Sequence, residues 1–327
     1  MTQPSSEQPA FTAAQQRNGA IALVAATFFW GSGFTWAKMG GETVHRVLGL
    51  PNGSPFGPIF LLAWRFLCAS IIWLLLFRSA RKGWTWRGVA RGLLLGFLVG
   101  VGLVVQHLGL DRTSEAVSAF LTSLTILFVP LLMTIVLRKP PPLELWAGVA
   151  LATVGVWLMT GATPHGFGLG EVLGLLCSFT FSLYILAVNA ILPHESPWRM
   201  TAAQFVVVSL MCFIACAVIH PRFLRPPVMA HVLSAPKVWI NMLLLAAFTT
   251  DLSFGLLTHF QPRLDATRAA LIYLLEPIVA AGYAAVAVHH ELSKSAILGA
   301  ALILLANIAV ELISARKRQM EKPMLID

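Results

Sequence analysis

Two carboxylates lie inside long apolar stretches of the sequence, where a charge is costly. Glu276 occurs in LIYLLEPIVA, within the apolar run 266–288, and Asp251 occurs in FTTDLSF, within the run 238–258. At 1.5 Å per helical residue, Glu276 lies about 16 Å into its segment. An ionised carboxylate at that depth costs at least a few kcal/mol unless it is paired, hydrated or protonated. Each acid therefore either binds a cationic solute group or a proton, or serves only the fold, by capping backbone near Pro277 or bonding polar neighbours.

Three further polar residues lie in apolar runs of the first half. Gln106 and His107 are adjacent near the end of the run 88–109, and Arg65 lies in the run 58–77. A histidine titrates near neutral pH and could serve a solute or a proton, but a hydrogen-bonded packing residue is the other interpretation. Arg65 is expected at headgroup depth, because arginine extends its charged end to the interface. Attraction of an anionic solute group stays open.

Aromatic residues offer a second kind of contact with a solute. Trp30 and Phe34 are one helical turn apart, so their shared face could stack on an aromatic or cationic solute. Tyr184 and Tyr273 are similar candidates in later runs. Helix packing, or an aromatic belt at the membrane interface, explains such residues without a ligand. Trp30 lies deep for a belt residue, which favours the solute.

The composition indicates that these residues lie in membrane-spanning helices. Of the 327 residues, 57% are hydrophobic and only 11% are charged, and the mean hydropathy is +0.77. A soluble protein of this length carries far more charge, and a membrane β-barrel would show alternation in stretches of about ten residues. The apolar residues instead fall in long blocks. The sequence therefore predicts an all-α membrane protein.

Ten blocks are near the length of about 20 residues that crosses a bilayer. They are 19–39, 58–77, 88–109, 116–137, 143–161, 170–192, 200–219, 238–258, 266–288 and 295–314. A polar tail, 1–18, precedes them and a basic tail, 315–327, follows them. The first block is not followed by a small-residue cleavage site, so we expect it to remain as a membrane helix.

The basic residues set the expected orientation. With both termini in the cytoplasm, the inner segments carry 15 Lys and Arg residues and the outer segments carry 7. This excess agrees with the rule that cytoplasmic loops are rich in positive charge, although the loop 220–237 runs against it. The same distribution accounts for the net charge of +9, so no nucleic-acid partner is expected.

The two halves of the sequence repeat each other weakly. GAIALVAATFFWGSGFTWAK at 19–38 aligns with GEVLGLLCSFTFSLYILAVN at 170–189, an offset of 151, and Pro130 aligns with Pro277 at an offset of 147. Five helices in each half is an odd number, so the second half must cross the membrane in the opposite sense. Inverted repeats place a substrate site near the midplane, where helices are broken. Because proline breaks a backbone hydrogen bond, we expect Pro130 and Pro277 to mark those breaks.

Motifs in both halves are similar to those of the EamA-type ten-helix branch of the drug/metabolite transporter superfamily. They are FFWGSGFTWAK at 28–38, AWRF at 63–66, GLDRTSEAVSAFLTSLTILFVPLL at 109–132 and TRAALIYLLEPIVAAG at 267–282. The resemblance implies two inverted five-helix repeats, 19–161 and 170–314, around a central cavity in the inner membrane. It also implies movement of small organic metabolites such as amino acids, often as export.

The residues and the resemblance together favour a secondary carrier that works by alternating access. Glu276 and Asp251 are the candidates for proton coupling, although neither acid proves it. The expected partners are a small-molecule solute and the lipid bilayer, and a homodimer stays open. The alternatives are a solute channel and an intramembrane enzyme, but no His-Glu-x-x-His, Walker or rhomboid-like serine motif supports an enzyme. The four cysteines lack metal-type spacing, and no cofactor is expected.

Overall fold

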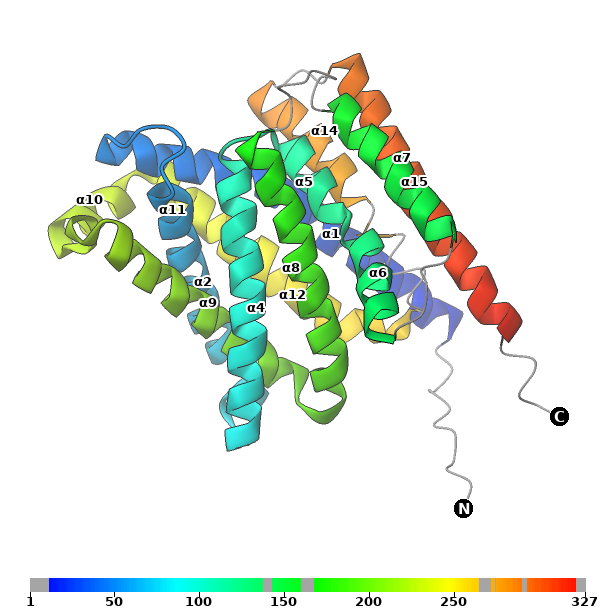
Figure 1. Cartoon of the computed structure of the whole chain (residues 1–327). Coiled ribbons are helices and arrows are strands. Elements are labelled where there is room, and N and C mark those ends of the chain that lie inside the picture. The colour runs from blue at the N-terminus through cyan, green and yellow to red at the C-terminus, as the bar shows by residue number, and fades with distance from the viewer. Residues whose placement is uncertain are drawn as a thin grey trace.

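The computed structural model describes residues 12–137, 143–159, 168–264, 272–273, 275–289 and 293–321, and no strand occurs among them. The first half contains α1 (Ala13–Leu48), α2 (Phe56–Leu76), α3 (Arg78–Arg81), α4 (Trp86–Leu110), α5 (Glu115–Ser123), α6 (Thr125–Leu137) and α7 (Leu143–Met159). The second half contains α8 (Leu169–Ile191), η1 (Leu192–His194), α9 (Pro197–Ile219), η2 (Pro221–Leu224), α10 (Pro226–Ser234), α11 (Pro236–Leu244), η3 (Leu245–Leu252), α12 (Ser253–Phe260), η4 (Gln261–Arg263), α14 (Glu276–Val288) and α15 (Lys294–Glu321). The described chain is therefore all-helical, as expected (Figure 1).

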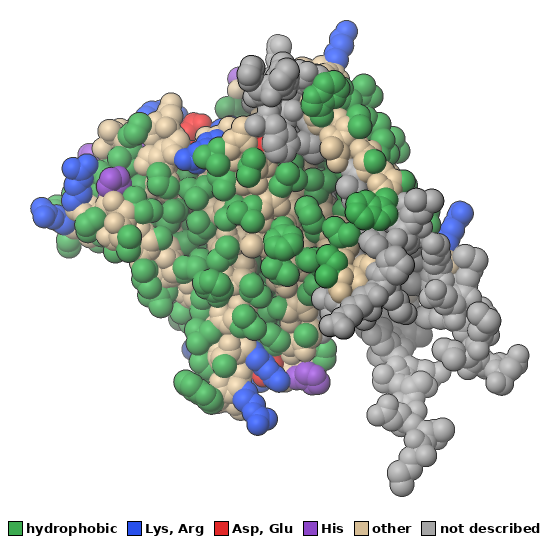
Figure 2. All heavy atoms as spheres, viewed as in Figure 1, with side chains coloured by type: hydrophobic (Ala, Val, Ile, Leu, Met, Phe, Trp, Pro, Cys, Tyr) green, Lys and Arg blue, Asp and Glu red, His purple; other side chains and the backbone are tan. Residues whose placement is uncertain are grey.

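Within the described ranges, seven helices are long and apolar enough to cross a membrane, and three shorter helices are apolar. The seven are Ala13–Leu48, Phe56–Leu76, Trp86–Leu110, Glu115–Ile135, Leu169–His194, Pro197–Ile219 and Pro236–Phe260, and the three are Trp146–Gly155, Glu276–Val288 and Lys294–Ala306. Each of the ten predicted blocks overlaps one of these helices. Figure 2 shows hydrophobic side chains over the middle of one face, with Lys and Arg toward its ends.

The first and last helices are longer than their apolar blocks. Thr12 starts α1 by accepting a hydrogen bond from the backbone N–H of Gln15 at 3.3 Å, as an N-cap residue does. α1 ends before Gly49, whose φ of 63° suits glycine. Residues 13–18 and 315–321, which the sequence assigned to the tails, are therefore helical. Hydropathy detects only the apolar part of a helix and misses its polar ends.

Helices from the two halves of the chain pack against each other. α4 packs on α8 and α9, α2 on α9, α7 on α15, and α1 on α14, η3 and α12. In Figure 1, α7 and α15 lie side by side at the edge of the bundle. The largest buried cluster includes Phe205, whose ring centroid is 5.6 Å from that of Phe66 and 5.5 Å from that of Trp73. The edge-to-face geometry of these rings stabilises the contact between α2 and α9.

Glycines allow α4 to approach α9 closely. A Cβ added to Gly92 would lie 2.6 Å from the Cβ of Ala203, and one added to Gly96 would lie 2.5 Å from the Cβ of Val207. Small residues of this kind permit the backbone contact that stabilises helix pairs in membranes. By contrast, a Cβ added to Gly282 of α14 meets nothing within 4 Å.

We expect Gly96→Ala to unfold at a lower temperature than the wild type, because overpacking a close contact costs about 1–3 kcal/mol. Gly282→Ala is the matched control. It adds the same methyl group to a helix with open space around it, and helix propensity favours alanine by about 1 kcal/mol. Thermal unfolding in detergent, followed by circular dichroism, measures both variants. Equal melting temperatures would contradict the close α4–α9 contact.

The fourth apolar segment is interrupted at Leu124, where a turn separates α5 from α6. The sequence placed this break at Pro130, but Pro130 lies six residues further on, inside α6. A tertiary contact accompanies this turn, because Ser178 of α8 donates its hydroxyl to the carbonyl of Leu121 just before it. The same carbonyl accepts the N–H of Leu124 at 3.1 Å, so it has two donors. A serine on a neighbouring helix, and not a proline, is therefore found at the break.

The ninth apolar segment is interrupted at Leu275, directly before α14. The N–H of Leu275 donates to the carbonyl of Ile272 at 3.0 Å, as the N–H of Leu124 donates to that of Leu121 at 3.1 Å. Pro277 is the second residue of α14, and proline fits the first turn of a helix because no hydrogen bond is lost there. Leu124 and Leu275 are 151 positions apart, the offset of the sequence repeat.

The eighth apolar segment contains a π-helix, η3, between α11 and α12. Backbone hydrogen bonds in a π-helix reach five residues back. Such turns are rare in proteins, and where they occur they are often at functional sites. The Thr250 hydroxyl donates to the carbonyl of Leu245, five residues earlier, at 3.0 Å. The indole N–H of Trp30 donates to the carbonyl of Thr249 at 3.0 Å. Side chains of η3 and α1 thus donate hydrogen bonds to backbone carbonyls of the π-helix.

Candidate functional site

Asp251 lies near the end of η3, and its carboxylate is buried. The residue is 7% exposed, and neither carboxylate oxygen has a hydrogen-bond partner among the described residues. The structural interpretation required bonds to Thr249 and Thr250, but their hydroxyls donate to the carbonyls of Phe29 at 3.2 Å and Leu245 at 3.0 Å. A buried carboxylate without hydrogen bonds destabilises the fold. This arrangement suits a group that accepts a proton or a solute from outside the chain.

Arg65 of α2 lies beside Asp251. It is 6% exposed, its Nε donates to the Thr250 hydroxyl at 2.8 Å, and its charge interacts with that of Asp251. The sequence placed Arg65 at headgroup depth. That expectation is corrected, because the side chain is held inside the bundle by a residue of η3.

His107 and Gln106 of α4 point toward different neighbours. His107 Nδ1 lies 2.9 Å from the carbonyl of Leu103, so we assign the proton to Nδ1, and Nε2 is left as a buried acceptor without a partner in the described chain. The charge of Arg65 interacts electrostatically with the His107 ring. Gln106 Nε2 donates to the Thr122 hydroxyl of α5 at 3.1 Å. Of this adjacent pair, His107 therefore faces Arg65 of α2 and Gln106 faces α5.

Glu276 is the first residue of α14 and directly follows the break at Leu275. An acid in the first turn of a helix is favoured by the helix dipole, which agrees with the structural alternative. The Glu276 side chain is within electrostatic range of the Cys177 thiol of α8. A Cβ added to Gly31 of α1 would lie 2.8 Å from the Glu276 carbonyl oxygen, so α1 and α14 are in close contact here.

Trp30 contacts aromatic rings on two other segments. The ring centroid of Trp30 is 5.8 Å from that of Tyr273 and 6.2 Å from that of Phe254. The hydroxyl of Tyr273 donates to Gln261 Oε1 at 3.1 Å. Because the indole N–H of Trp30 also bonds η3, this side chain contacts both the Asp251 segment and the Glu276 segment.

These side chains lie on seven helical segments, and we term them the polar ring. It consists of Trp30, Arg65, Gln106, His107, Thr122, Cys177, Thr249, Thr250, Asp251, Tyr273 and Glu276. Hydrogen bonds and ring contacts connect its members, except that Arg65 with His107 and Cys177 with Glu276 are related by charge alone. Its members come from α1, α2, α4, α5, α8, η3 and the ninth segment on both sides of its break at Leu275, and thus from both halves. The arrangement offers acceptors, one guanidinium and aromatic faces to a solute.

Two predicted solute-binding residues lie outside the polar ring. Phe34 is 7% exposed and packs in an apolar cluster with Leu61 and Leu245. Tyr184 donates its hydroxyl to Gln204 Oε1 at 2.5 Å, between α8 and α9. The structure therefore gives both residues packing and hydrogen-bond roles away from the acids.

Four members of the ring were not proposed as site residues from the sequence, namely Thr122, Cys177, Thr249 and Thr250. The Thr122 hydroxyl lies 3.9 Å from the Cys177 Sγ and accepts from Gln106. Threonine and cysteine are common in membrane helices, so their types carry no signal.

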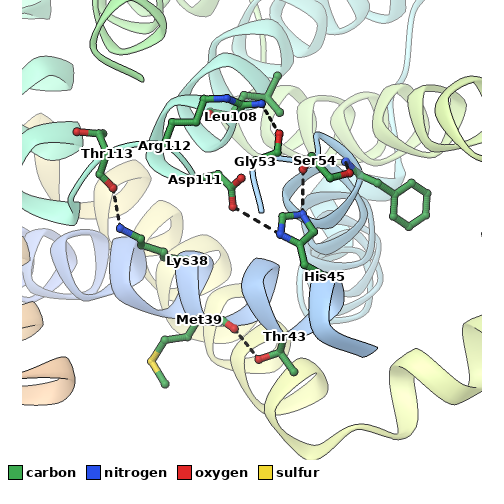
Figure 3. A network of polar contacts seen from close by, with 11 residues as sticks. Lys38, Met39, Thr43, His45, Gly53, Ser54, Leu108, Asp111, Arg112 and Thr113 are labelled. Carbon is green, nitrogen blue, oxygen red and sulfur yellow. Dashed lines mark hydrogen bonds and ion pairs between the residues drawn. The ribbon is translucent and has the colours of Figure 1, made fainter. Parts of the chain in front are cut away.

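A second polar network lies where α1 and α4 end (Figure 3). Lys38 Nζ donates to the Thr113 carbonyl at 2.6 Å and lies 3.6 Å from the Glu115 carboxylate. The Thr113 hydroxyl donates to Glu171 Oε1 at 2.7 Å. These bonds hold α1, the α4–α5 connection and the start of α8 together at one end of the bundle.

The same network reaches the α1–α2 connection. His45 Nε2 donates to the Ser54 carbonyl at 2.9 Å, and His45 Nδ1 lies 3.9 Å from the Asp111 carboxylate. Arg112 donates to the carbonyls of Leu108, at 2.7 Å, and Gly53. Burial raises the pKa of the Asp111 carboxyl, and the neighbouring His45 opposes this rise. Residues in this network lie about two helical turns along α1 from Trp30 and do not contact the acids of the ring.

The side chains do not assemble a metal site in the ranges that the structure describes. No group of three or more His, Cys, Asp or Glu residues there could hold an ion.

Three comparisons relate the chain to known proteins. The sequence model of the EamA-like transporter family matches residues 17–161 and 168–311. An uncharacterized transporter of Archaeoglobus fulgidus is 27% identical over 298 residues, which are 89% of this chain and 84% of that protein. One protein of known crystal structure superposes with a TM-score of 0.57 at 17% identity, covering 89% of this chain and 98% of its own. That last similarity concerns the fold alone.

Proposed function

Because the chain belongs to the EamA-like transporter family, we propose that it is a secondary carrier of small organic metabolites, such as amino acids, that works by alternating access. The family, within the drug/metabolite transporter superfamily, is one of transporters and not of enzymes, and the protein is a multi-pass membrane protein. Its direct partners are therefore a small-molecule solute and the bilayer. The proposal adds the direction, export, and coupling to protons through Glu276 and Asp251.

One observation carries this proposal. Asp251 is a carboxylate in a membrane-spanning helix, 7% exposed and without a hydrogen-bond partner in the described chain. Intramembrane acids of this kind are costly and mark solute or proton pathways. Its position on a π-helix, between helices of both halves, is the position expected for a midplane site between repeats.

The contacts between helices support two inverted five-helix repeats, 19–161 and 170–314. In two such repeats, α1 corresponds to α8, α2 to α9, α4 to the segment of η3 and α12, α5 and α6 to α14, and α7 to α15. Each contact between helices should then recur between their counterparts. The contact of α1 with α14 recurs as that of α8 with α5 and α6, that of α4 with α8 as α12 with α1, and that of α4 with α9 as η3 with α2. The contacts of α2 with α9 and of α7 with α15 are their own counterparts. The two matched family stretches are also similar in length. A pseudo-two-fold relation explains all these pairs together.

The charge distribution supports termini in the cytoplasm, and the family supports a location in the inner membrane. Arg65 was counted on neither side of the membrane in the sequence, and its side chain is buried inside the bundle. The remaining cations keep the excess of 15 inner over 7 outer residues. The end of the bundle with the Lys38 network then faces the outside.

Growth under exposure to toxic metabolite analogues tests the export function. Cells that overproduce the wild-type protein should tolerate at least one analogue better than cells that produce Asp251→Asn at the same level. Uptake of that solute into inverted vesicles should then depend on an imposed pH gradient. Equal tolerance across a broad panel of analogues, with both proteins in the membrane, would argue against export through this site.

A solute channel is the second candidate that the same site permits. A channel conducts without saturation, whereas a carrier saturates and shows counterflow. The breaks at Leu124 and Leu275 favour a carrier, because broken helices at a midplane site are typical of carriers with inverted repeats.

A further inference from the structure

The segment 220–237, which connects α9 to α11, carries a positive charge for which the carrier site gives no reason. Its sequence, HPRFLRPPVMAHVLSAPK, contains Arg222, Arg225 and Lys237 and no acid. In the proposed orientation it lies outside, where such an excess is unusual. The segment folds into η2 and α10. Figure 2 shows Lys, Arg and His side chains at the end of the molecule that α10 forms in Figure 1.

Apolar contacts hold this segment against the end of the bundle. The ring centroid of Phe223 is 5.2 Å from that of Phe56 at the start of α2 and 5.3 Å from that of His220. Val232 of α10 is buried in the largest apolar cluster, and Met229 packs against the same cluster. Residues on the opposite face of α10 are exposed. The segment is therefore a fixed platform with one face on the bundle and the other toward its surroundings.

Arg222 and Arg225 lie on the same side of a tight turn. Side chains three positions apart eclipse each other in a 3₁₀-helix, and the N–H of Arg225 closes this turn on the carbonyl of Arg222 at 3.4 Å. Both residues are exposed. The guanidinium of Arg222 lies 4.7 Å from the ring centroid of Phe223, so an anchored ring helps to position it. Two guanidinium groups placed in this way suit one phosphate group, whose oxygens match arginine in geometry and charge.

The flanking helices place the arginines at the membrane interface. α9 is long and apolar enough to span the membrane and ends at Ile219, and Val218 in its last turn is 79% exposed, as expected of a side chain that faces lipid tails. α11 begins at Pro236, and Trp239 in its first turn is 42% exposed. Exposed tryptophan is typical of the interface between membrane and water. The segment between these helix ends is therefore at the depth of lipid headgroups.

An anionic phospholipid is the occupant whose chemistry matches this surface. Its phosphate complements the arginine pair, and its acyl chains lie beside the exposed apolar residues of α9 and α11, a contact that a free phosphate does not make. Basic clusters next to membrane-spanning helices bind anionic lipids in this way. α1, which packs against α10, adds one exposed cation, Arg46, and one exposed acid, Glu42. These two charges cancel and leave the balance of the segment positive.

We propose that Arg222 and Arg225 bind the phosphate of an anionic phospholipid, with Lys237 adding a positive charge at the start of α11. The lipid neutralises the cations of the segment, which gives a reason for their place on the outer side. None of these residues belongs to the polar ring, so the proposal goes beyond the carrier function and does not depend on it. α11 continues directly into η3, and the bound lipid thus lies at the start of the segment that carries Asp251.

Photo-cross-linking in vesicles tests the proposal. The full-length protein is reconstituted in phosphatidylcholine with a small fraction of a phosphatidylglycerol analogue that carries a photoreactive group near its phosphate, and labelled peptides are identified by mass spectrometry. We expect labelling of 220–237 that falls about twentyfold in Arg222→Gln/Arg225→Gln, because each cation near an anionic surface contributes about fivefold. Arg222→Lys/Arg225→Lys keeps both charges and should keep most of the labelling. A phosphatidylcholine analogue should label the segment weakly.

Arg78→Gln/Arg81→Gln is the matched control. These two arginines are also exposed and three positions apart, on the short helix α3 between α2 and α4. The variant removes the same charge from the protein, and labelling of 220–237 should stay at the wild-type level. Melting temperatures in detergent identify misfolded variants before the labelling is compared.

Other results would overturn the proposal. Equal labelling of 220–237 by the two analogues, or equal labelling of the wild type and Arg222→Gln/Arg225→Gln, would mean that the arginines do not select an anionic headgroup. Complete displacement of the lipid by inorganic phosphate would identify a site for a free anion. A dimer, measured by light scattering, that Arg222→Gln/Arg225→Gln converts to a monomer would identify a second copy of the chain as the occupant. All these outcomes leave the carrier function standing, since solute flux is measured separately.

Discussion

Asp251→Asn is expected to lower the rate of solute transport about ten- to hundredfold while the protein stays folded. The variant keeps the shape of the side chain but removes its charge, and an interaction with a charged group contributes about 1.5–3 kcal/mol, where about 1.4 kcal/mol is tenfold. The rate in proteoliposomes is the measurement. Glu276→Gln should lower the rate similarly and also remove the response to an imposed pH gradient.

Asp111→Asn is the matched control for the loss of a buried acid. Asp111 is also a buried aspartate, with its side chain 5% exposed, but it contacts His45 at the end of the bundle and not the polar ring. It should keep most of the wild-type rate. Full transport by both Asp251→Asn and Glu276→Gln would show that neither acid serves the solute or the proton.

Gly31→Val is expected to reduce transport more than tenfold, because α1 and α14 meet at Gly31 without space for a side chain. An added Cβ would lie 2.8 Å from the Glu276 carbonyl oxygen and 2.8 Å from the Cβ of Val279. The first of these is a backbone atom, which moves only if α14 moves, so the substitution displaces Glu276 from the ring. Transport in proteoliposomes and the melting temperature report the effect.

Gly282→Val, on α14, serves as the control for Gly31→Val. A Cβ at Gly282 meets nothing within 4 Å, so the same valine should be tolerated there. Gly31→Ala should fall between wild type and Gly31→Val, since its methyl group meets the same atoms with less bulk. Wild-type transport by Gly31→Val would mean that the observed α1–α14 contact is not maintained during the cycle.

The positions of the helices were predictable because they depend on local composition. A block of about 20 apolar residues is a property of the chain alone, and every predicted block overlaps a helix. The locations of the breaks were not predictable. The break was predicted at Pro130 because Pro130 aligns with Pro277, but the turn is at Leu124, where Ser178 of another helix bonds the Leu121 carbonyl. The π-helix at η3 has no sequence signature of its own.

The acids of the site were also predictable, but their partners were not. The cost of a carboxylate in a membrane made Asp251 and Glu276 candidates without a structure. Arg65 was misplaced because hydropathy does not reveal that Thr250 lies beside it in space. Trp30 and Phe34 share a helical face, but only Trp30 belongs to the ring. Trp30 contacts η3 and Tyr273, whereas Phe34, one turn further along α1, packs in an apolar cluster.

Alternating access through the polar ring is the central claim, and counterflow tests it most directly. Proteoliposomes containing the wild-type protein are loaded with an excess of the unlabelled solute found in the growth screen, and the entry of labelled solute from outside is followed. We predict that internal solute accelerates entry, that entry saturates with external concentration, and that Asp251→Asn loses both properties. Entry that rises linearly with concentration and is unaffected by internal solute would contradict the carrier and indicate a channel.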